Sequence, residues 1–214
     1  MGRLILTNDV LTEIDEAQLI TGRLDPSPNK EGEVQSVKLA TYVIEKCGAI
    51  DYIASSLAKR VKKFTHHLCL NNIAKKSVLP SRNNVLSERD FGVLNGTRYS
   101  LNSDLFTHTR ICAQGGESIS ECRDRMFGFV VAICQKHDNI LIASHPFACQ
   151  ILTNKILNHD HTLLTEFWFQ KASFIVLRFD KNTGWKFKDG YHAISEKKYS
   201  EEEIYSRILK TKGS

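Results

Sequence analysis

Short apolar runs alternate along the chain with longer segments whose apolar residues recur at helical spacing. The runs occupy residues 4–7, 50–54 and 140–143, and polar residues follow each of them. Such runs are typical of buried parallel strands, and the longer segments are typical of the helices that connect parallel strands. We therefore predict an α/β fold of three layers, in which helices cover both faces of a mainly parallel central sheet.

Helix ends are recognisable in the segments between these runs. Gly48 suits a C-cap, Ser118 and Glu121 have the spacing of a capping box, and Pro146 takes the tolerated first-turn position of a helix. Together with the helical spacing, these signals place helices at residues 31–47, 57–70, 118–136 and 147–157.

The first of these helices has an ambiguous apolar pattern. Its predicted buried stripe consists of Val34, Val37, Ala40 and Ile44. Leu39 and Val43 fall on the far side of that stripe, so we expect this helix to be covered on two faces.

The remaining segments complete one predicted domain of 214 residues. Residues 174–179 and 185–188 are expected to form a β-hairpin, and residues 78–80 a short strand. Ser200 and Glu203 are placed to cap a short helix that runs to Lys212. Residues 86–116 have weak periodicity and many polar residues, which is typical of an excursion or lid over the carboxyl edge of a sheet.

The composition limits the classes of function. Apolar content of 42% and charged content of 25% are ordinary for a globular domain, and a net charge of +5 indicates a mixed surface rather than a nucleic-acid footprint. Six cysteines without a C-x-x-C pair are typical of buried, reduced thiols in a chain of this length. Apolar stretches are too short for a signal peptide or a membrane span. We expect a cytoplasmic protein without nucleic-acid or membrane partners.

Two histidine clusters and one aromatic run have ordinary explanations. His159-Asp160-His161 lies in a polar loop without an evident third ligand, and His66 and His67 fall on different faces of a helix. We therefore predict no metal site and no cofactor. The aromatic residues 167–169 are typical of a core segment or of a subunit contact, and the second interpretation would make the protein a homodimer.

Polar residues at the ends of the predicted strands define the candidate site. In open α/β sheets, ligands bind at the carboxyl ends of the parallel strands. The residues that follow the three strands are Asn8 and Asp9, Ser55 and Ser56, and Ser144 and His145; Arg60 lies one helical turn beyond Ser56. We expect these side chains to meet in one pocket.

With this set in order, the chain resembles the histidine phosphatase superfamily, whose members have the phosphoglycerate-mutase-like fold. The resemblance runs from about residue 4 to about residue 187, which is nearly the whole chain. Five segments carry it in matching order: residues 22–25 with Gly32 and Gln35, residues 55–60, residues 86–92 with 95–96, residues 116–118, and residues 142–145.

The resemblance implies phosphoryl chemistry. In such enzymes an Arg-His-Gly triplet follows the first strand, and its histidine attacks phosphorus to become a phosphohistidine. Two arginines and a second histidine bind the phosphoryl oxygens, and an acid protonates the leaving oxygen. Carried over to this chain, Arg60 and His145 match the phosphoryl-binding positions and Glu88 matches the acid. Asn8, Arg23 and Ser144 complete the predicted substrate-binding set.

The triplet itself is replaced by Asn8-Asp9-Val10. Asp9 stands at the nucleophile position and Asn8 at the first arginine position, while Pro146 follows His145 where the family has glycine. Asp15 matches a polar position a little downstream. Without an imidazole at the first strand, the phosphohistidine route is closed. A carboxylate there also repels phosphate unless it is protonated or paired with Arg60.

Two classes of function follow. We predict a divergent member without phosphatase or mutase activity by the usual route, which keeps part of the phosphate pocket for a small-molecule ligand, phosphorylated or not, or for assembly. The alternative is a repurposed enzyme in which Asp9, Glu88 and His145 perform acid/base chemistry on a small molecule. Attack by Asp9 itself stays open, although aspartyl phosphatases need a second aspartate where this chain has Leu11. Phosphatase action by direct water attack also stays open.

Overall fold

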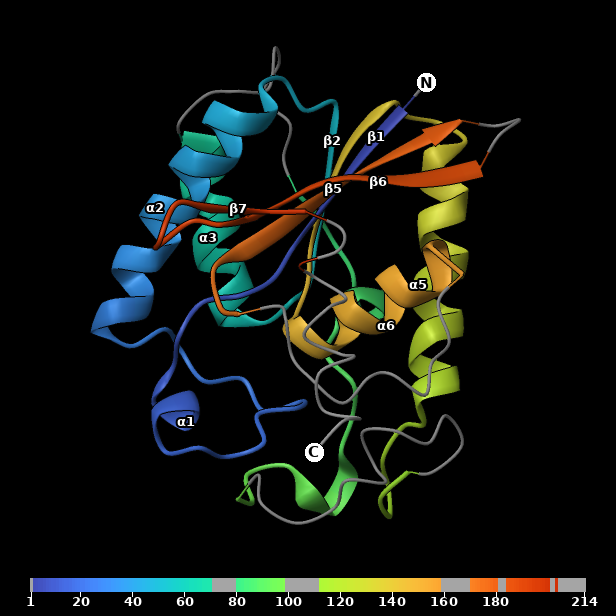
Figure 1. The fold of residues 1–214 in the computed structure, drawn as a ribbon. Helices are drawn as coiled ribbons and strands as arrows, with labels where there is room; N and C mark the ends of the chain where they lie inside the picture. The colour runs from blue at the N-terminus through green and yellow to red at the C-terminus, as the bar shows by residue number, and fades with distance from the viewer. Residues whose placement is uncertain are drawn as a thin grey trace.

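The computed structural model describes residues 2–70, 80–98, 112–158, 170–180, 184–200 and residue 203. Within these residues seven strands form one sheet in the order β3-β2-β4-β1-β5-β6-β7 (Figure 1). The strands are β1 (Gly2–Thr7), β2 (Tyr52–Ser55), β3 (Ser81–Arg82), β4 (Asn139–Ala143), β5 (Ser173–Asp180), β6 (Gly184–His192) and β7 (Lys197–Tyr199).

Helices cover both faces of the sheet, as predicted (Figure 1). α2 (Lys30–Cys47) and α3 (Lys59–Leu70) lie on one face, where Ile5 of β1 belongs to their buried cluster. α5 (Ile119–Cys134) and α6 (Pro146–Ile156) lie on the other face, with Leu4 and Leu6. This split follows from the two-residue period of a strand, which sends neighbouring side chains to opposite faces. The short α1 (Glu13–Glu16) and the 3-10 helices η1 (Asn84–Leu86) and η2 (Gly92–Leu94) lie beyond the carboxyl ends of the parallel strands.

The sheet is mixed, so the prediction of a mainly parallel sheet is only partly matched. Of the six strand pairs in the described sheet, the three that join β3, β2, β4 and β1 are parallel. The three that join β1, β5, β6 and β7 are antiparallel. The predicted hairpin already required one antiparallel pair, because a short turn reverses the chain. Its turn, residues 181–183, lies outside the described residues.

The buried face of α2 is rotated from the predicted stripe. Val34 and Val37 are 54% and 45% exposed, whereas Leu39 and Val43 are fully buried. The stripe was right at Ala40, which is fully buried, and at Ile44, which packs against the buried cluster. It was wrong at Val34 and Val37 because Gln35 and Ser36 are buried polar residues at the start of the same face, and hydrophobic spacing does not register them. The predicted C-cap is confirmed: Gly48 has φ of 65° and its N–H donates to Ile44.

Two predicted helix starts are confirmed, whereas the predicted position of the short strand is not. The capping box of Ser118 and Glu121 is present at the start of α5, and Pro146 opens α6. The short strand begins at Ser81, after the predicted residues 78–80, of which 78 and 79 lie outside the described residues. A strand of two exposed residues at a sheet edge has no apolar pattern by which to place it.

Several predictions fall wholly or partly outside the described residues. These are the histidines at 159 and 161, the aromatic run 167–169, residues 99–111 of the excursion, and most of the tail helix. At the start of that helix the expected cap is present, since Ser200 and Glu203 exchange reciprocal hydrogen bonds. The prediction of a homodimer stays a prediction. Across the described part of the chain, none of the helices combines the length and the apolar composition that crossing a bilayer would need.

Candidate functional site

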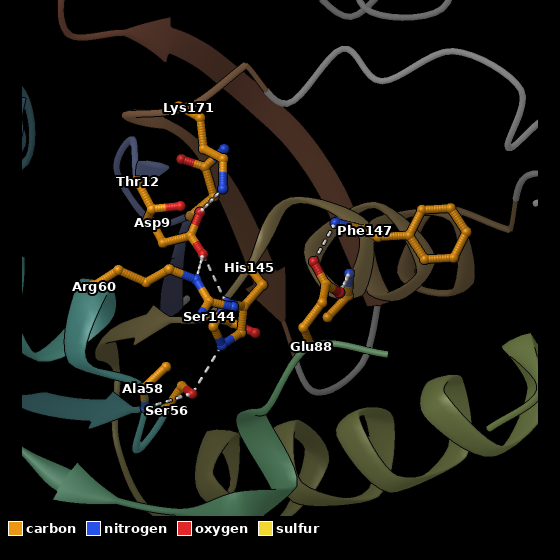
Figure 2. A network of polar contacts seen from close by, with 12 residues as sticks. Asp9, Thr12, Ser56, Ala58, Arg60, Glu88, Ser144, His145, Phe147 and Lys171 are labelled. Carbon is orange, nitrogen blue, oxygen red and sulfur yellow. Dashed lines mark hydrogen bonds and ion pairs between the residues drawn. The ribbon is translucent and has the colours of Figure 1, made fainter. Parts of the chain in front are cut away.

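The residues that follow the parallel strands meet at the carboxyl edge of the sheet. Register aligns Thr7 of β1 and Ser55 of β2 with Ala143 of β4, so the three strands end at one level. Asp9, Ser56 and His145 therefore approach one another from three strands, as the sequence predicted for this edge (Figure 2).

The Asp9 carboxylate is the centre of this arrangement. Its Oδ2 accepts a hydrogen bond from Arg60 Nε at 2.6 Å and lies 2.7 Å from His145 Nδ1. Its Oδ1 accepts from Lys171 Nζ at 2.7 Å. The Asp9 and Arg60 side chains are almost completely buried. Three donors from three segments thus converge on one buried carboxylate (Figure 2).

These donors keep Asp9 ionised. Burial alone would raise the pKa of the carboxyl, but the charges of Lys171 and Arg60 and the hydrogen bond from His145 outweigh burial and hold the pKa far below its usual range. An ionised carboxylate can only accept hydrogen bonds, so the proton of the His145 ring lies on Nδ1.

His145 is held as the neutral imidazole. Burial first, and the neighbouring charge of Arg60 second, lower the pKa of its ring. With Nδ1–H donating to Asp9, the free lone pair lies on Nε2, which is 2.9 Å from Ser56 Oγ. The Ser56 hydroxyl therefore donates to His145, and it accepts the N–H of Ala58 at 3.3 Å. Arg60 Nη2 lies 3.1 Å from Nδ1, but with Nδ1 protonated both groups are donors, so they form no hydrogen bond with each other.

Neutral His145 gives folding a pH dependence of defined sign. An imidazole titrates near pH 6.5 in an unfolded chain, at about its ordinary value, and lower in this fold. As pH falls, the unfolded chain takes up the proton before the folded chain does. The contribution of His145 to the free energy of unfolding is therefore complete above about pH 6.5 and is lost below it. The loss is at most about 1.4 kcal/mol per pH unit. We expect His145→Asn to flatten the slope of unfolding free energy between pH 7 and pH 5, measured by urea titration. An unchanged slope would contradict the neutral, buried ring.

Arg60 donates to three protein groups. Besides Asp9, its Nη1 donates to the carbonyl of Leu24 at 2.8 Å and its Nη2 to the carbonyl of Gly22 at 3.4 Å. Gly22 has φ of 45°, and a Cβ there would lie 1.9 Å from Asn95 Oδ1, so only glycine fits this turn. Arg60 thereby fixes the loop at residues 22–24 over the site.

Lys171 was not predicted. It precedes β5 and lies 2.7 Å from Asp9 Oδ1 and 3.1 Å from Asp15 Oδ1. Burial alone would lower the pKa of its ammonium group, but the carboxylates of Asp9 and Asp15 outweigh burial and raise it. Lys171 lies before an antiparallel strand. The strand-end rule predicts site residues only after parallel strands, so it could not identify Lys171. The sequence offered one usable signal: a buried, ionised Asp9 requires a positively charged partner.

Asn8 and Ser144, two predicted substrate-binding residues, bond to the main chain. Asn8 Nδ2 donates to the carbonyl of Gln170 at 2.6 Å, and its Oδ1 accepts from Ser173 N at 2.8 Å. The Ser144 hydroxyl donates to the carbonyl of Leu86 at 2.8 Å. Both side chains are fully buried. They tie β5 and η1 to the ends of β1 and β4, which fixes the walls of the site.

Glu88, the predicted acid, caps α6. Its Oε1 accepts from the N–H of Ala148 at 2.8 Å and of Arg89 at 2.9 Å, and its Oε2 accepts from Phe147 N at 3.1 Å (Figure 2). A carboxylate at a helix N-terminus is favoured by the helix dipole and by the unpaired amides there. Glu88 borders the site, with both of its oxygens directed at main-chain donors.

Two cavities flank Arg60. One, of about 350 Å³, has an apolar wall formed by Leu19, Ile20, Phe91 and Phe147, and its charged side chains are Asp9, Asp15, Arg60, Glu88 and Lys171. The other, of about 310 Å³, contains Arg23, Ser56, Asn84, Ser87 and His145 in its wall. Arg23, a further predicted binding residue, lies 3.7 Å from Glu117 and is partly exposed at this second cavity. Gly22, Arg60 and Glu88 border both.

The charged lining of the first cavity contains two cations and three acids. Acidic side chains therefore outnumber basic ones in this lining. Among the described residues no group of three histidine, cysteine or acidic side chains is arranged to hold a metal ion.

A sequence model of the histidine phosphatase superfamily (branch 1) matches residues 11–189 of the chain. The match begins two residues beyond Asp9. No curated protein sequence matches the chain.

Solved structures share its fold. Mycobacterial hydrolase 1 superposes with a TM-score of 0.78 at 15% identity, over 87% of this chain and 96% of that chain. The mycobacterial glucosyl-3-phosphoglycerate phosphatase in complex with VO3 gives 0.76 at 16% identity, over 88% and 98%. A mutant phosphoserine phosphatase from Entamoeba histolytica, in complex with phosphoserine, gives 0.77 at 19% identity, over 91% and 98%. Identities this low establish the shared fold alone.

Proposed function

This chain belongs to the histidine phosphatase superfamily, and we propose that it binds a small molecule at the carboxyl edge of its sheet without passing a phosphoryl group through a histidine. In this proposal Asp9 occupies the position of the family's nucleophilic histidine. The mycobacterial and Entamoeba phosphatases of the same fold, by their names, act on phosphorylated compounds. The edge cavity is the part of the fold that this chain has altered.

The contacts of Asp9 carry the proposal. Arg60 and Lys171 both pair with this carboxylate, so the charges that would hold phosphoryl oxygens are already compensated. A phosphate placed beside Asp9 would gain less attraction from these two cations and would be repelled by the carboxylate. At about 4 Å and an effective dielectric of about 20, one such pair of charges is worth roughly 4 kcal/mol.

The lining of the larger cavity indicates which ligand it fits. An apolar wall of leucine, isoleucine and phenylalanine side chains faces a polar end with an excess of acids. Such a cavity favours a neutral or cationic small molecule, with its apolar part against Phe91 and Phe147 and its polar part at the charged end of the cavity. The volume of about 350 Å³ is within the range of small-molecule sites.

The acid/base alternative retains one supporting observation. The contact of 2.7 Å between Asp9 and His145 orients the imidazole as a general base would require. Glu88 would have to give up main-chain hydrogen bonds in order to donate a proton, so the assignment of the acid to Glu88 has less support than the Asp9–His145 pair.

Phosphoryl chemistry can be tested directly. We expect the purified protein to release no more nitrophenol from p-nitrophenyl phosphate than its Asp9→Asn and His145→Ala variants do. We also expect no acid-labile phosphohistidine after incubation with labelled phosphate donors. Turnover that both substitutions abolish, or a phosphorylated histidine found by mass spectrometry, would contradict the proposal.

Ligand binding is tested by thermal shift with matched panels of metabolites. Neutral and cationic compounds are expected to stabilise the wild type, and phosphorylated analogues of the same compounds are expected to stabilise it less. Phe91→Ala, which removes part of the apolar wall, serves as the binding-deficient control. A preference for the phosphorylated partner of each pair would overturn the assigned ligand chemistry.

A further inference from the structure

We propose that Ser56, His145 and Asp9 form a serine-nucleophile triad that cleaves carboxylic esters bound in the smaller cavity. The inference goes beyond ligand binding, and it assigns a nucleophilic role to a residue to which neither the family resemblance nor the acid/base alternative gave a role. Ser56 Oγ lies 2.9 Å from His145 Nε2, and His145 Nδ1 lies 2.7 Å from Asp9 Oδ2. This is the order of contacts by which a buried aspartate orients an imidazole and the imidazole activates a hydroxyl.

The state of each group agrees with its role. Asp9 is ionised and fixes the proton on Nδ1, which leaves Nε2 with a lone pair directed at the hydroxyl (Figure 2). The opposite carboxylate oxygen bonds to Lys171, so Asp9 is held from both sides and cannot turn away from the ring. A general base must be unprotonated, and His145 is neutral in the fold because burial lowers the pKa of its ring.

A purely structural role for Ser56 explains less of the geometry. As a turn-forming residue before α3, Ser56 would need only to accept the N–H of Ala58, a contact that is long at 3.3 Å. Its shorter contact is the one to His145. Ser55 provides the comparison: it is the neighbouring buried serine, and its hydroxyl donates to the carbonyl of Ser56 at 2.9 Å.

Ser56 is only 1% exposed, but it is one of the residues that line the smaller cavity. Ser56 and His145 line the cavity of about 310 Å³, together with the carboxylates of Asp25 and Glu88 and with the side chains of Arg23, Asn84 and Ser87. The last three side chains carry N–H or O–H donors, which suit an oxygen that becomes negative during acyl transfer. The modest volume favours esters of small acids.

The reaction balances with water as the second reactant. Ser56 Oγ forms a bond to the carbonyl carbon while His145 Nε2 takes the hydroxyl proton. Collapse of the tetrahedral adduct breaks the bond to the alcohol oxygen, which receives that proton from Nε2, and the acyl group stays on Ser56. A water molecule then attacks the acyl carbon and gives a proton to Nε2. The acid leaves as Ser56 Oγ recovers the proton.

The test uses an alkyl fluorophosphonate, which reacts covalently with activated serines. We expect the wild type to gain one adduct, located at Ser56 by peptide mass spectrometry. We expect Ser56→Ala to lose it, and His145→Gln and Asp9→Asn to slow its formation at least about 100-fold. The control variant Ser36→Ala, whose buried hydroxyl donates to the carbonyl of Gly32 within α2, should label at the wild-type rate. The rates at which the wild type and the variants hydrolyse p-nitrophenyl butyrate should rank in the same order as their labelling rates.

Mapping the adduct in the wild type decides the matter even if a variant fails to fold. No adduct on the folded wild type, or an adduct elsewhere that Ser56→Ala retains, would overturn the triad. Labelling of Ser56 that does not depend on His145 would overturn the role of the imidazole. These outcomes are separate from a failure of the proposed function, which would appear as phosphohistidine or as preferred binding of phosphorylated ligands.

Discussion

Replacing Asp9 with asparagine is expected to lower the free energy of unfolding by about 3–5 kcal/mol and to create a phosphate site at the same time. The change leaves Arg60 and Lys171 without their shared carboxylate, and an uncompensated buried charge has a cost of about this size. The two cations then flank a neutral amide, so an anion from solution can replace the missing charge. Urea unfolding in phosphate-free buffer measures the loss. Titration with phosphate measures the gain.

Phosphate should restore part of the lost stability only in the Asp9→Asn variant. A ligand at 100 times its Kd stabilises the folded state by about 2.7 kcal/mol. Phosphate also stabilises folded proteins without binding a site, so the wild type and Glu45→Gln are measured in the same buffers. Glu45 pairs with Lys46 at the surface and is a suitable control, because such exposed pairs contribute little. Equal responses of the variant and the controls would show that Asp9 does not block an anion site.

The strand-end rule predicted much of the site because it depends on topology rather than on detail. Asp9, Ser56 and His145 each follow a parallel strand, and register brings such residues to one edge. The family predicted from ordered segments is confirmed by the match over residues 11–189. Both inferences use signals that the chain carries locally: apolar runs, caps and short motifs in sequence order.

These local signals could not predict contacts that depend on the tertiary structure. Lys171 enters the site from the turn before an antiparallel strand, and nothing in its own neighbourhood marks it as a partner of Asp9. Gln35 and Ser36 are buried polar residues, so a pattern built on apolar spacing placed the inner face of α2 wrongly. The same limit applies to Asn8, whose amide bonds to main-chain groups more than 160 residues away. Such contacts exist only once the sheet has formed.

Removing Arg60 together with Asp9 is expected to cost less than the sum of the two single losses. Arg60→Met alone leaves a buried carboxylate with one cation fewer, a change worth about 3–5 kcal/mol. In Asp9→Asn/Arg60→Met the charges disappear together, so the double variant should fall short of additivity by about 2–3 kcal/mol. The carbonyls of Gly22 and Leu24 lose their donor in both Arg60 variants, so their contribution cancels in the cycle.

An exposed ion pair supplies the scale for this coupling. Lys63 and Glu33 form a contact of 2.5 Å between partly exposed side chains, and a cycle on such a pair should give no more than about 1 kcal/mol. A coupling between Asp9 and Arg60 well above that value requires a desolvated, mutually dependent pair. If the Asp9–Arg60 cycle is additive to within about 0.5 kcal/mol, the carboxylate does not neutralise the guanidinium. Arg60 would then remain available to an anionic ligand, and the altered chemistry assigned to this sheet edge would lose its physical basis.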